Sequence, residues 1–267
     1  MAEWKHALRA YPHLLRASFA ASVAYRVAFL IVLVSTTMPL VMLALWLEVT
    51  RTSPVDGFTA RRFTVYYLTS IIVRIATGCW VVYDVTNELR LGTLNYRLLR
   101  PLHPLLAYSA ENLAEAPMRA LVCAPVLFVL IGPLHADICH DPVLWAAFLP
   151  AVFGAWLLAF FSTALIGMLA FWFDKAMSVF YAWTAVTAVL SGYIVPLDLL
   201  PGPVRAFAHV APFRFLLSFP VEIVAGRLER RQALLLLALQ WTYLGLGFFA
   251  ARLVWRRGLR RHGAFGD

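Results

Sequence analysis

Long apolar runs, separated by short polar segments, are the feature that most constrains this chain. Apolar residues make up 62% of the 267 residues and charged residues only 14%, whereas a soluble domain is ~45–50% apolar and ~25% charged. A run of about 20 apolar residues can cross the hydrocarbon core of a bilayer as a helix. The sequence therefore predicts an all-α fold, a polytopic membrane helical bundle. We expect one membrane domain over residues 1–267, with no room for a soluble ATPase domain.

Six runs are predicted to be transmembrane helices. The third and fourth exceed the length needed to cross, so we expect them to tilt or to project beyond the bilayer. Pro117, Pro125 and Pro150 are expected to kink them. The six predicted spans are residues 27–47, 63–85, 105–134, 143–173, 176–195 and 233–255.

The basic residues lie mainly at the ends of the apolar runs. With the N-terminus in the cytoplasm, the cytoplasmic segments hold more Lys and Arg than the external ones, as the positive-inside rule requires. We therefore expect a multi-pass protein with both termini cytoplasmic. The net charge of +9 is then explained by contacts with anionic membrane lipids, and no nucleic-acid partner is expected.

Residues 1–25 are predicted to form an amphipathic helix at the membrane surface. Trp4, Leu8, Tyr11 and Leu15 recur at helical spacing while the basic residues occupy other faces, a pattern typical of helices that lie in the headgroup plane. The alternative is a frayed tail. The segment lacks the long apolar stretch of a cleavable signal peptide.

The main polar interruption, residues 83–104, is predicted to contain a short amphipathic helix. Gly92 breaks the chain, Thr93 is suited to cap the first turn, and Pro101 ends the helix. Leu94 and Leu98 fall on one face, and Arg97 and Arg100 stand at the end that favours cations. A helix held this way between two spans can act as a lever for a cytoplasmic partner. The alternative is a solvated loop.

Residues 195–231 are too apolar for a solvated loop but are interrupted by five prolines, at positions 196, 201, 203, 212 and 220. Proline removes a backbone donor and stops a helix. We therefore predict two short re-entrant helices on the external side, with a helix–break–helix over Leu199–Ala225. Arg205, Arg214 and Arg227 are expected to face headgroups or carboxylates such as Asp198 and Glu222. The alternative is a segment lying flat on the membrane.

Four ionisable residues fall inside predicted spans, where they are costly and are candidates for function. Glu111, Glu115 and Arg119 follow at i, i+4 spacing in the third span, and Arg74 lies near the middle of the second. We expect Arg74 to pair with Glu115, either as a structural salt bridge or as part of a polar network that lines a pathway.

Motifs for catalysis or nucleotide binding are not found. The sequence has no P-loop, dinucleotide-binding or protease signature, so we predict no catalytic residues and no cofactor bound by this chain. Cys79 and Cys123 lie in apolar runs, where cysteine acts as a small hydrophobe. The turn that holds His135, Asp137, His140 and Asp141 could hold a metal, although a polar external turn is the more common use of such residues.

The order of these elements resembles the permease subunits of ABC type-2 transporters, in particular the bacterial branch with paired permeases and a daunorubicin-resistance-like ATPase. The segments YDVTNELRLGTLNYRLLRPLHPLLAY and VPLDLLPGPVRAFAHVAPFRFLLSFPVEIVAGRL carry the resemblance. It implies a bacterial inner-membrane location, two copies of an ABC ATPase subunit that uses ATP and Mg²⁺, and a second permease, either a paralogue or a second copy. It gives no substrate residues. A lipophilic or amphipathic exported substrate is our expectation, and a non-transporting membrane scaffold or sensor is the alternative.

The resemblance implies roles for two groups of residues. The cytoplasmic segment 86–104 would be the coupling helix that docks on the ATPase, and the proline-rich segment would be the external re-entrant helices, which we expect to act as a gate. The predicted coupling residues are Asn87, Glu88, Arg90, Gly92, Thr93, Leu94, Arg97, Leu98 and Arg100. The predicted gate residues are Leu199, Leu200, Phe207, Phe213, Arg214, Phe215 and Glu222.

Overall fold

The structure, a computed structural model, describes residues 11–20, 37–51, 53–55, 57–100 and 102–263. The described part is helical, and its only β-type pairing is an isolated bridge between Val55 and Phe58. Two shorter apolar helices accompany four stretches that are long and apolar enough to cross a membrane. Those stretches are Ala60–Arg90, Pro104–Ile131, Pro142–Phe171 and Arg230–Arg261. This confirms the predicted all-α membrane bundle.

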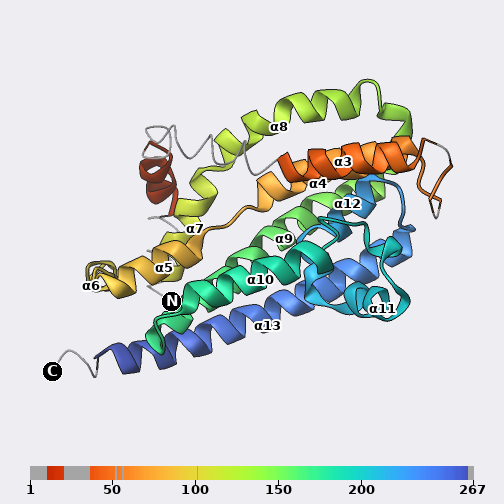
Figure 1. Cartoon of the computed structure of the whole chain (residues 1–267). Coiled ribbons are helices and arrows are strands. Elements are labelled where there is room, and N and C mark those ends of the chain that lie inside the picture. Colours follow the sequence, from red (N-terminus) through yellow and green to blue (C-terminus); the bar gives the residue numbers. More distant parts are fainter. Residues whose placement is uncertain (1–10, 21–36, 52, 56, 101, 264–267) are drawn as a thin grey trace.

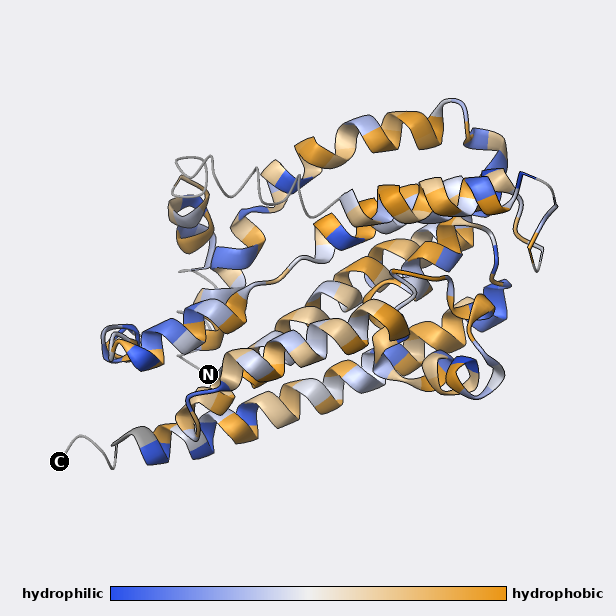
Figure 2. Ribbon diagram, viewed as in Figure 1, coloured by the Kyte–Doolittle hydropathy of each residue, from blue (hydrophilic) through white to orange (hydrophobic). Residues whose placement is uncertain are grey.

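Helix α9 (Pro142–Met168) lies at the centre of the bundle (Figure 1). It contacts α4, α5, α10, α12 and α13, while α3 and α8 pack against α4. Figure 2 shows hydrophobic residues along the helices and hydrophilic ones gathered toward the two ends. The bounds of these helices are α3 Thr37–Val49, α4 Ala60–Thr77, α5 Val81–Arg90, α8 Ala116–Ile131, α10 Ala176–Leu190, α12 Ser218–Val224 and α13 Arg230–Gly263.

The two ends of the bundle differ. Helix α6 (Leu94–Leu98) and the C-terminal end of α13 lie at one end, and α11 (Gly202–Val210) lies with α12 at the other (Figure 1). The short helix between spans and the proline-rich segment are therefore on opposite sides of the membrane domain, as the sequence predicts.

The predicted second span is not continuous. Helix α4 ends at Thr77, and Gly78 takes an extended conformation (φ −53°, ψ 127°) before α5 begins at Val81. Glycine disfavours a helix interior because it loses the most backbone entropy there. Cys79 therefore lies in a break between two helices, although the stretch Ala60–Arg90 around it is long and apolar enough to span a membrane, as predicted.

The predicted third span is also divided. Helix α7 (Pro104–Ala114) and α8 meet at Glu115, and Pro117 occupies the first turn of α8. Proline fits that position because the amide it lacks would be unpaired there. Pro125 and Pro150, by contrast, lie within the continuous helices α8 and α9.

The predicted fifth span ends early, since α10 stops at Leu190 rather than continuing to residue 195. Gly192 then adopts a left-handed φ of +84°, and its carbonyl accepts a hydrogen bond from the Tyr66 hydroxyl (2.7 Å). A Cβ at this position would collide with that hydroxyl. Only glycine meets both requirements.

The proline-rich segment forms the predicted helix–break–helix. Helices α11 and α12 are separated by the 3-10 turn η4 (Pro212–Leu216), and the turn η3 (Leu197–Leu199) precedes them. Arg214 forms an ion pair with Glu222, and Arg227 pairs with Asp198 (2.9 Å). The carboxylate partners predicted for two of the three arginines are thus confirmed.

Of the predicted N-terminal surface helix, residues 11–20 are described, and they are helical. Tyr11 and Leu15 are half-buried while Arg16 is exposed, and the Tyr11 hydroxyl lies 3.3 Å from that of Ser109. This part is amphipathic as predicted. The rest of residues 1–25, and residues 27–36 of the first predicted span, lie outside the described residues.

Two glycines of α13 provide a test of its packing on the bundle. A Cβ at Gly258 would lie 2.7 Å from Cγ of Phe171, whereas one at Gly245 would meet no atom within 4 Å. Alanine favours a helix over glycine by about 0.5–1 kcal/mol. We expect Gly245→Ala to be neutral or stabilising by that amount and Gly258→Ala to be destabilising by about 1–3 kcal/mol. Thermal unfolding in mild detergent would measure both. Equal effects would contradict the close packing at Gly258.

Candidate functional site

The short helix α6 is set by Gly92. This residue has a φ of +69°, a left-handed conformation that favours glycine. Thr93 itself has helical dihedral angles, and its hydroxyl makes no capping hydrogen bond. The predicted cap by Thr93 is therefore wrong, and the positive φ of Gly92 is what redirects the chain.

Helix α6 turns Leu94 toward the bundle. Leu94 is fully buried in a core cluster with Val85, Tyr108 and Trp255, which corrects the prediction that it contacts a partner. Leu98 is 37% exposed. The largest exposed apolar side chains here are Leu91, Tyr96 and Leu99, at 67%, 72% and 83%, and the sequence analysis did not select them as coupling residues. The predicted residues that are exposed are Asn87, Arg90, Gly92, Thr93, Leu98 and Arg100.

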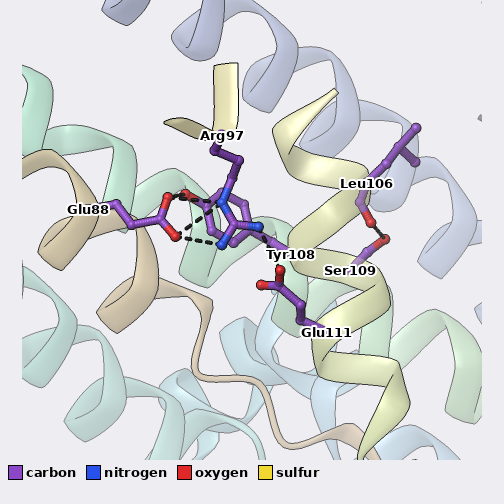
Figure 3. Close-up of polar contacts among 6 residues, drawn as sticks. All are labelled: Glu88, Arg97, Leu106, Tyr108, Ser109 and Glu111. Carbon is purple, nitrogen blue, oxygen red and sulfur yellow. Dashed lines mark hydrogen bonds and ion pairs between the residues drawn. The ribbon is translucent and has the colours of Figure 1, made fainter. Parts of the chain in front are cut away.

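Arg97 joins α6 to two other helices (Figure 3). Its Nε donates to Glu88 Oε2 of α5 (3.0 Å) and its Nη1 to Glu111 Oε1 of α7 (2.7 Å). The guanidinium lies 4.1 Å over the Tyr108 ring, and the Tyr108 hydroxyl donates to Glu88 (2.6 Å). Arg97 is therefore a link between three helices and does not serve only the helix dipole.

The environment keeps Arg97 charged. Burial alone would lower its pKa, but the hydrogen bonds to Glu88 and Glu111 raise the pKa above its usual value. Hydrogen bonds of a charged donor to a carboxylate are roughly twice as strong as neutral ones. Because the side chains of Arg97 and Glu88 are only 14% and 19% exposed, water screens the pair weakly.

A cavity of about 450 Å³ lies between the two broken helices and the centre of the bundle. The α4–α5 break contributes Gly78, Cys79 and Trp80, and Glu115 comes from the α7–α8 break. Helices α4, α5, α8, α9 and α10, the end of η4, and residues Ser191 and Tyr193 also contribute to the walls. Non-helical backbone at membrane depth is tolerated where protein covers it or where it lines a cavity, and both breaks meet this condition.

The predicted intramembrane network divides into two parts. Glu111 belongs to the Arg97 cluster, whereas Arg74, Glu115 and Arg119 line the cavity. Arg119 pairs with Glu115 (2.6 Å), and Arg74 lies 4.4 Å over the ring of Tyr193. The predicted Arg74–Glu115 pair is therefore wrong, because the i, i+4 partner in the same polypeptide segment lies closer to the carboxylate.

The predicted gate residues lie in the proline-rich segment but in different environments. Phe215 and the Arg214–Glu222 pair are buried, Leu199, Leu200 and Phe213 are half-buried, and Phe207 is 59% exposed. The ring of Phe213 lies 4.9 Å from that of Trp183, a cavity residue. The proline-rich segment is thus in direct contact with a wall of the cavity.

The turn with two histidines forms ion pairs instead of a ligand cluster. Asp137 pairs with Arg61 and Asp141 with Arg230, while the two imidazoles face each other. The hydrogen bond from Arg230 lowers the pKa of Asp141. Within the described ranges, no group of three or more potential metal ligands lies together.

Several residues of these sites are absent from the sequence predictions. Tyr108 is one, and the cavity residues Trp80, Trp183, Thr187 and Tyr193 are among the others. The break that brings the cavity residues together is marked in the sequence only by Gly78, a single glycine in an apolar run.

The Arg97 link leads to a stability prediction. Arg97→Ala would leave Glu88 largely buried and without its cation, so we expect a loss of about 1–3 kcal/mol. Arg100→Ala, two positions beyond the end of α6 and exposed, is the control and should stay within about 0.5 kcal/mol. Thermal unfolding in mild detergent measures both. An unchanged Arg97→Ala protein would show that the link does not hold α6.

Comparison with known proteins identifies the family. The family described as "ABC-2 family transporter protein" matches residues 30–266, a range that includes both helix breaks, α6 and the external segment. Comparisons with curated proteins and with solved structures returned no match. Together with the apolar helices, the match makes this chain a multi-pass membrane protein of the transport-subunit type and not a catalytic enzyme. This chain belongs to the ABC-2 transporter family.

Proposed function

We propose that this chain is the permease subunit of an ATP-driven exporter and that a separate ATPase docks on the α6 end. The observation that carries the proposal is the way α6 is held. Leu94 and Arg97 fasten the helix to the bundle, and Leu91, Tyr96 and Leu99 remain on its outer surface. A fastened helix with an exposed apolar surface can transmit a displacement, whereas a solvated loop cannot.

The geometry supports a route from this surface to the cavity. Arg97 binds Glu88 of α5 and Glu111 of α7. Helix α5 begins at the break after Thr77, and α7 ends at the break at Glu115. A movement of α6 would therefore displace α5 and α7, and each of these helices adjoins one of the two breaks. Both breaks line the cavity. Packed elements with two discrete arrangements are how such displacements are carried.

The other components of the transporter follow from the family. Proteins of the ABC-2 family work with ATPase subunits, and we propose that two copies of one, using ATP and Mg²⁺, serve this permease. A second permease, a paralogue or another copy of this chain, would complete the pathway in a bacterial inner membrane. The cavity reaches the surface at Trp80 and Tyr181, which are 43% and 60% exposed. We propose that this side faces the pathway.

The external segment is proposed to close the outer end of this pathway. Phe213 touches Trp183, and Leu216 and Leu217 form part of the cavity wall. The buried Arg214–Glu222 pair, with the Ser218 hydroxyl donating to the same carboxylate (2.7 Å), gives the segment a fixed shape. A wall of fixed shape can move as a unit.

Docking is tested by charge on the outer surface of α6. Tyr96→Asp and Leu99→Asp should leave the chain inserted and folded, because both side chains are exposed, but should abolish co-purification of the ATPase and substrate-stimulated ATP hydrolysis. A carboxylate buried at an interface without a partner costs several kcal/mol. Val210→Asp, 62% exposed on α11 at the opposite end, is the control.

Two results would contradict this proposal. Unchanged co-purification and ATP hydrolysis in both α6 variants would exclude docking on this surface. A wild-type chain that brings down no ATPase would favour the scaffold or sensor alternative.

Orientation is tested with thiol reagents. Cys139 lies at the α12 end, where its amide donates to the Val224 carbonyl (2.8 Å). A membrane-impermeant maleimide should label Cys139 from outside, and a Leu99→Cys variant should be labelled at residue 99 only from the cytoplasm. Cys139→Ser, which removes the external signal, is the control. Labelling of Cys139 only from the cytoplasmic side would invert the proposed orientation.

A further inference from the structure

The charges around the cavity do not balance. Two arginines and one glutamate line it. Arg119 and Glu115 form an ion pair, which leaves Arg74 as the excess positive charge. Arg74 lies over the Tyr193 ring, and no carboxylate forms an ion pair with it among the described residues. A cation in a low-dielectric setting attracts an anion far more strongly than the same cation in water.

Few of the other polar groups in the wall can donate to an anion. The hydroxyls of Ser162, Thr163 and Thr184 donate to carbonyls of their own helices. The Thr187 Oγ1 differs, because it is buried and has no hydrogen-bond partner in the described part of the chain. A buried hydroxyl without a partner costs free energy that a ligand acceptor would recover. Arg74 supplies the charge, and Thr187 supplies a buried hydroxyl that has no other partner in the described part of the chain; both line the same cavity and can donate to an anionic group.

The rest of the cavity is aromatic. The aromatic wall is formed by the α4–α5 break, α5 and α10, and its residues are Trp80, Tyr83, Phe180, Tyr181 and Trp183. Such surfaces bind hydrocarbon through burial of apolar area, and the volume falls within the ~300–1,000 Å³ of small-molecule sites. The lining combines a cationic donor with a broad apolar wall.

We infer that this cavity binds an amphipathic molecule with one anionic group, the anion at Arg74 and Thr187 and the hydrocarbon part against the aromatic wall. Cationic and uncharged amphiphiles of the same size are bound less well, because neither compensates Arg74. That this ligand is the transported substrate rests on the proposed function.

Binding can be measured on the purified chain in an uncharged detergent. The probe is 11-(dansylamino)undecanoic acid, which receives excitation energy from tryptophans such as Trp80 and Trp183. Its methyl ester is the matched neutral probe. We expect the acid to bind about ten-fold more tightly than the ester or better, as a hydrogen-bonded charge predicts. Arg74→Gln should remove that preference, whereas Arg74→Lys should keep most of it.

Two further variants keep the test decisive. Arg257→Gln removes an equal charge at an exposed site outside the cavity and should leave binding unchanged. Thr187→Val removes a hydroxyl that holds nothing in the fold, so the protein should fold normally and bind the acid several-fold more weakly. If Arg74→Gln fails to fold, Thr187→Val alone decides the question.

Competition between the fluorescent probe and unlabelled lipids identifies which kind of anionic molecule the cavity binds. Displacement of the probe by laurate indicates a single-chain acid, and displacement by phosphatidylglycerol indicates a phospholipid; either result supports the inference. Equal affinity for acid and ester, or unchanged binding in both Arg74→Gln and Thr187→Val, would overturn it. No ATPase enters this assay, so a negative result would leave the proposed partner in place, and loss of ATPase co-purification would not alter a positive binding result.

Discussion

The link made by Arg97 is the interaction on which the working parts of this protein depend. One guanidinium holds α6 against α5 and α7 through Glu88 and Glu111. Without it, the two carboxylates would repel each other across a partly buried gap, and α6 would be attached mainly through Leu94. The planar guanidinium presents its donors in a rigid fork. Charge-assisted hydrogen bonds from Arg97 to two helices therefore fix the orientation of α6 relative to them as well as its distance.

The Arg97 link connects α6 to both helix breaks, because α5 begins at one break and α7 ends at the other. The break at residues 78–80 contributes Gly78, Cys79 and Trp80 to the cavity wall, and a continuous helix would not present them in the same way. At each break the chain changes direction within a few residues. Helix α9, in contrast, is continuous from Pro142 to Met168. The structure therefore combines an unbroken central helix with two interrupted neighbours, and hinge motions in proteins are absorbed by a few residues at the ends of such elements.

Much of the fold could be predicted from the sequence, because apolar runs and clustered prolines are local signals. The helix–break–helix of the external segment is an example. The orientation of α6 was not accessible in this way. Spacing places Leu94 and Leu98 on neighbouring positions of a helix, but it does not tell whether that side faces the bundle or a partner. Likewise, Glu111 lies 14 residues from Arg97, and only the tertiary packing of α7 brings them together. Arg74 was assigned the wrong partner for the same reason.

The length of α13 has a consequence for the partner. A helix of 34 residues rises about 50 Å at 1.5 Å per residue, against a hydrocarbon core of about 30 Å. It is therefore longer than a crossing requires, and it extends to the end of the bundle where α6 lies (Figure 1). This extension carries the exposed arginines Arg252, Arg256, Arg257 and Arg260. Any protein that contacts α6 would also lie next to the positively charged C-terminal part of α13. Acidic residues on the part of that protein nearest α13 would therefore be favoured over basic ones.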